Sequence, residues 1–153
     1  KKDSLKSSII TGLDALSDVD VIHIIEADAI PKFSTLAAML EVYENAPNPA
    51  GICPIFSWNN QTCYPTHRHW FKDPLFEKSF GRAGEVREVG KPGIPFLFSL
   101  WNPNALKVMK SKENELPEVY SLDGKMGRIL HEKYRFYRVM NHHIEHIGGG
   151  KNK

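Results

Sequence analysis

A run of β-branched residues near the N-terminus constrains the fold of this chain more than any other feature. Residues 19–25 hold Val or Ile at five of seven positions, a density typical of a strand buried on both faces of a parallel sheet. The run ends in Glu26-Ala27-Asp28, so two carboxylates follow the strand directly. Because ligands bind at the carboxyl ends of strands in open α/β sheets, the sequence predicts that Glu26 and Asp28 lie in a crevice.

The remaining elements alternate in type along the chain. Apolar residues recur at helical spacing from Ser4 to Leu16, and a second helix is predicted from the capping residue Ser34 to Asn45. Further strands are predicted at 51–56, 94–100 and 136–140, and further helices at 105–110, behind Asn102-Pro103, and from Asp123 to Leu130. Residues 66–93 have no steady period and are predicted to form a long loop or an irregular hairpin. This order predicts one α/β domain over residues 1–153, with a mixed, largely parallel sheet flanked by helices.

The composition excludes several classes of protein. The chain has 153 residues and a net charge of only +2, which argues against a nucleic-acid partner. It has no apolar run long enough to span a membrane and no apolar signal segment after its first residues. We therefore expect a soluble, cytoplasmic protein, with a secretory lumen as the alternative. Cys53 and Cys63 lack C-x-x-C spacing and are expected to be free thiols.

Glu26 and Asp28 are candidates for a divalent-cation site. Residues two apart in an extended chain point in the same direction, so both carboxylates would face one crevice. Hard cations such as Mg²⁺ and Mn²⁺ take oxygen ligands and keep open positions for substrate phosphates. The same tripeptide is also compatible with an acidic turn that holds no ligand, and both interpretations stay open at this point.

A second candidate site follows the last predicted strand, where His142, His143 and His146 lie close together in the sequence. Imidazole suits Mn²⁺ and Zn²⁺. The glycines at 148–150 would let the backbone approach an anion. The alternative interpretation is a histidine-rich surface segment without a ligand.

Two further residues occupy positions that suit a crevice. Asp123 begins a predicted helix, where the helix dipole alone favours a carboxylate; the functional alternative is a general base that takes a proton from an attacking hydroxyl. Trp101 ends a predicted strand, so we expect its ring near a bound sugar, with a place in the core as the alternative.

Taken in order, these motifs resemble a known group of enzymes. A hydrophobic strand ends in Glu26-Ala27-Asp28, Asp123 begins a later helix, and His146-Ile147-Gly148-Gly149 follows the next strand. In this order the chain resembles a GT-A glycosyltransferase, most closely the large inverting family 2 group. The resemblance covers nearly the whole chain, and its specific positions are the carboxylate motif, the later acidic residue and the histidine.

The resemblance implies transfer of a sugar from a nucleotide-diphosphate donor to a hydroxyl of a glycan or another acceptor. It implies that Asp28 and His146 ligate Mn²⁺ or Mg²⁺, and that Glu26 faces the ribose or a metal-bound water. Trp101 is assigned to the nucleotide-sugar site. Asp123 would act as the catalytic base, with inversion at the anomeric carbon.

The resemblance also bears on the N-terminal part of the domain. A GT-A domain begins with a strand, a helix and a strand that bind the nucleobase, whereas this chain starts at the helix before the carboxylate motif. We therefore expect the C-terminal two-thirds of such a domain, which would bind nucleotide sugar poorly by itself. An incomplete sheet has an open edge, so we expect self-association or pairing with a missing N-terminal segment.

Two other functions remain as alternatives. A metal-dependent hydrolase would use His142, His143 and His146 together with Asp28, around one ion with an open water position. A module without catalytic activity would use the aromatic segment from Trp58 to Phe80 to bind glycan or protein.

Overall fold

The computed structural model describes residues 4–16, 18–30, 32–58, 61–64, 80–90, 93–118 and 121–147. The α-helices in these residues are α1 (Leu5–Ala15), α2 (Phe33–Asn45), α3 (Pro103–Ser111) and α4 (Leu122–Leu130), and the 3₁₀ turns are η2 (Gly81–Ala83) and η3 (Glu113–Glu115). The strands are β1 (Ile22–Ile25), β2 (Ala29–Ile30), β3 (Pro49–Trp58), β4 (Gln61–Tyr64), β5 (Val86–Val89), β6 (Phe98–Trp101) and β7 (Arg135–His146).

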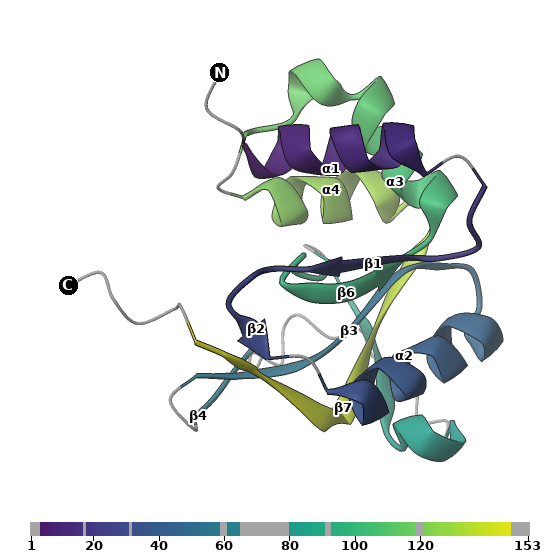
Figure 1. The fold of residues 1–153 in the computed structure, drawn as a ribbon. Helices are drawn as coiled ribbons and strands as arrows, with labels where there is room; N and C mark the ends of the chain where they lie inside the picture. Colours follow the sequence, from purple (N-terminus) through teal and green to yellow (C-terminus); the bar gives the residue numbers. More distant parts are fainter. Residues whose placement is uncertain are drawn as a thin grey trace.

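The elements form a sheet with helices on both faces. Figure 1 shows α1, α3 and α4 above the sheet and α2 below it. Buried side chains of α2 pack on one face of the central strands, among them Ala38, Met39 and Val42, each with no exposed surface. The predicted α/β class is therefore confirmed.

The sheet is mixed, but the expectation of a largely parallel sheet is wrong. Its seven strands follow the order β1-β6-β3-β7-β2, with β4 beside β3 and β5 beside β7. Only the β3–β7 pairing is parallel among the described strands, and the other five pairings are antiparallel. The prediction failed for two reasons. The predicted strand β6 runs antiparallel to both β1 and β3, and the short strands β2, β4 and β5, which were not predicted as elements of the sheet, each pair antiparallel with a long strand.

Strand directions nevertheless bring distant segments to one edge. Because β6 is antiparallel to both β1 and β3, and β3 is parallel to β7, the strands β1, β3 and β7 all run the same way. The carboxyl ends of β1 and β7 therefore lie at the same edge of the sheet.

Local sequence signals explain most of the helix ends. Asn102 caps α3 with Pro103 in the first helical turn, as predicted. Ser4, which was not predicted as a cap, caps α1 by accepting the Ser7 N–H. The prediction that Ser34 caps α2 is wrong. Lys32 occupies that position, because its backbone carbonyl accepts the N–H groups of Thr35 and Leu36, and so α2 already begins at Phe33.

The last strand is longer than predicted. It was expected over 136–140, but β7 continues to His146, so the histidine cluster lies within the strand and not behind it. Of the polar residues in this second half, Asn141 and His143 are exposed, whereas His142, Glu145 and His146 are partly covered. In the region predicted as a long loop or an irregular hairpin, 66–93, residues 86–89 form the strand β5, and residues 65–79 lie outside the described part of the chain.

Candidate functional site

The carboxylate turn after β1 is held by hydrogen bonds on both sides. The Glu26 N–H donates to the Leu97 carbonyl at 2.8 Å, which extends the β1–β6 pairing by one residue, and the Ala29 N–H donates to the Glu26 carbonyl at 3.1 Å. The chain then forms β2, whose Ala29 lies opposite His146 of β7. The turn is thereby fixed between two strands. The sequence predicted that the acids follow the end of β1, but it did not predict β2 or its pairing with β7.

Asp28 and His146 are in direct contact, although 118 residues separate them in sequence. His146 Nε2 and Asp28 Oδ2 are 2.9 Å apart. The Ile147 N–H also donates to the Asp28 carbonyl at 2.8 Å, so the backbone as well as the side chains join the two segments. The Asp28 side chain keeps 41% of its surface exposed and the His146 side chain 20%. The pair is thus ordered by its surroundings and open to solvent.

Glu26 lies within electrostatic range of the same pair. Burial raises the pKa of the Glu26 carboxyl, the negative charges of Asp28 and Asp123 raise it further, and the charge of His146 lowers it. Like charges close together make ionisation of each one harder. A bound cation would reverse this effect, because an opposite charge favours the carboxylate form.

Asp123 lies in the first turn of α4 and belongs to the same acidic group. Its Oδ1 accepts the N–H of Gly124 at 2.8 Å, and the side chain is partly exposed. The preceding Ser121 has a φ of 63° and provides no side-chain cap. The Asp123 carboxylate therefore accepts one of the free backbone N–H groups at the start of α4, while its charge raises the pKa of Glu26.

The prediction that Trp101 lies at the sugar site is not supported by its position. Its ring has no exposed surface, stacks on Phe96 with centroids 4.8 Å apart, and meets Phe136 edge-on at 5.7 Å. Because β6 is antiparallel to β1, Trp101 pairs with Ile22 at the beginning of β1, far along the strand from Glu26. The expectation assumed that both strands end at the same edge, and Trp101 is a core residue.

The other histidines of the cluster are not gathered around Asp28. His142 Nε2 is 2.8 Å from the Arg82 carbonyl oxygen, and the adjacent His143 is exposed. No group of three or more Asp, Glu, His or Cys side chains placed to hold one ion occurs in the described part of the chain. The hydrolase alternative therefore gains no support from the geometry.

The segment that would carry the binding-module alternative is largely outside the described residues. Phe80 is described and belongs to the core. Sequence reasoning also missed two features near the site. One is β2, whose two residues are too few for a periodic signal, and the other is a pocket between α1 and β1 that ends at Glu26.

No family model and no curated protein matches this chain. In the described residues, no helix is both long enough and apolar enough to cross a membrane.

Proposed function

We propose that this chain carries the metal and diphosphate site of a glycosyltransferase, which transfers a sugar from a nucleotide-diphosphate donor to an acceptor hydroxyl. The observation that carries the proposal is the contact between Asp28 and His146 at the end of β1 and β7. Glu26 is within electrostatic range of both residues of this contact, and the charge of Asp123 acts on Glu26 in turn.

The spacing of the pair fits a divalent cation. Two ligand atoms that each lie about 2.1 Å from an octahedral ion, at right angles to one another, are about 3 Å apart. Asp28 Oδ2 and His146 Nε2 are 2.9 Å apart, which is also the length of the hydrogen bond that joins them. A Mn²⁺ or Mg²⁺ ion would replace the shared proton, and the imidazole and the carboxylate would turn so that both atoms face the ion. One carboxylate oxygen and one imidazole nitrogen form a donor set that suits Mn²⁺ in particular.

Two protein ligands leave most positions of such an ion to other groups. Mg²⁺ is commonly held by one or two carboxylates together with substrate phosphates and waters. When bound, the ion would stabilise the negative charge that develops on the departing nucleoside diphosphate. The half-buried Glu26 would then bind the ribose or a water of the ion, as its place beside Asp28 suggests.

Asp123 is the residue we assign to the acceptor. A general base must lie within hydrogen-bond reach of the hydroxyl whose proton it takes. Asp123 is partly exposed and lies close enough to Glu26 for its charge to raise that pKa. Attack by the activated hydroxyl from the side opposite the diphosphate would invert the anomeric carbon.

The strand directions support a GT-A-like arrangement in spite of the antiparallel pairings. β1, β3 and β7 share one direction, so the acidic turn and His146 lie at a common carboxyl edge. That edge is the expected ligand position in open α/β sheets.

The proposal is tested by calorimetry of UDP and GDP with the full chain, with and without Mn²⁺. We expect nucleotide binding that depends on Mn²⁺ and weakens at least about tenfold in Asp28→Asn and His146→Gln, in line with the cost of disturbing metal sites. Two matched variants serve as controls: Asp20→Asn removes an exposed acid before β1, and His142→Gln changes a histidine on the same strand as His146.

The outcomes separate the roles. Asp123→Asn should leave nucleotide affinity unchanged and abolish any transfer from UDP- or GDP-sugars to an acceptor that the parent chain catalyses. Metal-independent nucleotide binding, or equal losses in the controls, would contradict the proposal. Glycan binding without metal or nucleotide would favour the binding module.

A further inference from the structure

Strand β1 forms one end of the described sheet and has β6 as its one neighbour there. The Glu26 N–H donates to Leu97 across this pairing, and in an antiparallel ladder the residues that bond to a given neighbour alternate. Ile22 and Ile24 therefore direct their backbone groups at β6, like Glu26. The N–H and C=O groups of His23 and Ile25 point away from β6, towards the open edge.

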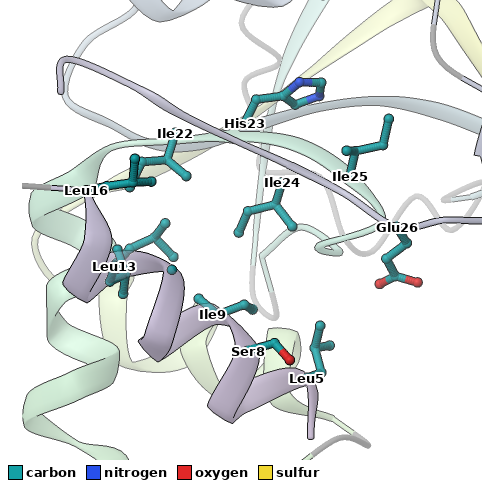
Figure 2. Close-up of a pocket in the computed structure, with 12 residues that line it drawn as sticks. Leu5, Ser8, Ile9, Leu13, Leu16, Ile22, His23, Ile24, Ile25 and Glu26 are labelled. Carbon is teal, nitrogen blue, oxygen red and sulfur yellow. The ribbon is translucent and has the colours of Figure 1, made fainter. Parts of the chain in front are cut away.

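A groove follows this edge. It lies between α1 and β1, has a volume of about 330 Å³, and its only charged lining side chain in the described residues is Glu26. Figure 2 shows Ile22 and Ile24 pointing from β1 towards Ile9 and Leu13 of α1, whereas His23 and Ile25 point away. The side chains of an additional strand would have apolar space on the α1 side.

The position of α1 explains why the groove stays open. The Lys6 ammonium donates to the carbonyls of Glu113 and Leu116 at 3.1 and 3.2 Å, and pairs with the Glu118 carboxylate at 2.7 Å. The Lys6 N–H also donates to the Glu118 carbonyl. These bonds fasten the start of α1 to the segment around η3 and not to β1.

Three of the six large apolar side chains that are exposed in the described residues lie near this edge. Leu16, Val19 and Ile25 are exposed by 40%, 39% and 45%, and they follow one another from the end of α1 along β1. Native sheets protect open edges with charged residues, prolines or very short strands. β5 carries Arg87 and Glu88 and β2 has two residues, but Ile22–Ile25 contains none of these devices.

The charges around the edge are acidic at both ends. Asp18 and Asp20 are exposed before β1, and Glu26 and Asp28 follow it. A second copy of this edge, turned antiparallel, would bring these acids against one another, which is unfavourable. A strand with basic ends would meet them with opposite charge.

We propose that the β1 edge is a docking site for an extended polypeptide segment that adds a strand to the sheet, with apolar side chains in the α1–β1 groove and basic residues at its ends. The backbone groups of His23 and Ile25 supply the hydrogen bonds. Strand addition of this kind obtains affinity from the main chain and specificity from alternate side chains. The inference does not rest on metal or nucleotide binding, but it shares the acids Glu26 and Asp28 with the proposed metal site.

The test uses the full chain and a short synthetic peptide of alternating valine and threonine with lysine at both ends. We expect the amides of His23 and Ile25 to exchange hydrogen at least about tenfold more slowly with peptide. The amide of Ile24, which already bonds to β6, should change little. The same peptide with N-methylated backbone amides keeps its side chains and should lose at least about tenfold in affinity.

Variants of the edge add a second readout by fluorescence anisotropy of the labelled peptide. Ile25→Lys should reduce affinity at least about tenfold, whereas Phe33→Lys, at a residue 85% exposed on α2, should not. Asp18→Asn with Asp20→Asn should weaken binding and flatten its salt dependence.

Three results would overturn the proposal. The first is no binding of the peptide at all. The second is equal binding of the N-methylated peptide, which would indicate occupation of the groove without strand addition. The third is a dimer in light scattering without peptide, with His23 and Ile25 already protected, which would assign the edge to a second copy.

Discussion

Replacement of Arg138 by methionine should stabilise the protein, because this arginine is a buried cation with incomplete hydrogen bonding. Arg138 lies on β7, directly opposite Cys53 in the pairing with β3 and directly opposite Arg87 in the pairing with β5. Its exposed surface is 1%. Its Nε and Nη1 atoms have no hydrogen-bond partner in the described structure. Burial lowers the pKa of the Arg138 guanidinium, against a contribution from the Cys53 side chain that raises it.

The magnitude follows from these facts. Each buried donor without a partner costs about 1–3 kcal/mol, and a like charge directly opposite on a neighbouring strand is also unfavourable. Exchange of buried ionic groups for apolar residues of similar volume is neutral or stabilising by about 1–4 kcal/mol. We expect Arg138→Met to raise the free energy of unfolding within that range. The thermal midpoint should rise by about 2–4 °C for each kcal/mol in a domain of this size.

Urea and thermal unfolding followed by circular dichroism measure this change. Arg138→Ala separates charge from volume, since it removes the same cation but leaves a cavity, and it should be less stable than Arg138→Met. Arg128→Met, at an exposed position of α4, should stay within about 0.5 kcal/mol of the parent protein. A loss of more than about 1 kcal/mol in Arg138→Met alone would refute the reasoning.

Three further changes have defined outcomes. Gly93→Ala should cost about 1–3 kcal/mol in urea unfolding, because Gly93 has a φ of +96° and a Cβ there would lie 2.9 Å from the Gly127 Cα; an unchanged midpoint would contradict this. Tyr137→Phe should cost about 1–2 kcal/mol by leaving the Pro47 carbonyl without its 2.7 Å hydrogen bond. Burial raises the pKa of Tyr137 to about 12. An alkaline absorbance titration of Tyr137→Phe should therefore lack the tyrosine that ionises at the highest pH in the parent protein. The folded-state pKa of Glu26 lies above its ordinary value of 4.5, so the free energy of unfolding falls as the pH rises from 4.5 through the folded-state pKa. Glu26→Gln should therefore raise the thermal midpoint at neutral pH but not below pH 4.5. Equal shifts of the midpoint at both pH values would argue against this reasoning.

Local signals in the sequence predicted the parts of the fold that depend on local physics. The apolar spacing in Leu5–Ala15 and the cap formed by Asn102 with Pro103 were sufficient for α1 and α3. The β-branched run correctly indicated β1, although the strand begins only at Ile22. These features depend on side chains within a few residues of one another.

Features set by strand pairing could not be predicted in the same way. Nothing in Phe98–Trp101 indicates that β6 runs antiparallel to β1, and that direction moves Trp101 away from the acidic turn into the core. The extension of β7 depends on partners from β3 and β2 along its whole length. Register and direction follow from contacts across the sheet, which single-strand patterns do not contain.

The candidate site lies between these two cases. The acidic turn was predicted from the strand it follows, and the pairing of Asp28 with His146 was expected from the order of motifs in the resemblance. The structure brings the two side chains to 2.9 Å through the β2–β7 ladder. Their roles as metal ligands, and that of Asp123 as base, stay predictions.

The most direct test of the central proposal is pulsed electron paramagnetic resonance of Mn²⁺ added to the full chain with UDP or GDP. If Asp28 and His146 hold the ion, the spectrum should show coupling to an imidazole nitrogen and to phosphorus of the nucleotide. The nitrogen coupling should vanish in His146→Gln and persist in His142→Gln. Bound Mn²⁺ without nitrogen coupling in the parent protein, or with coupling unchanged in His146→Gln, would contradict the proposed site.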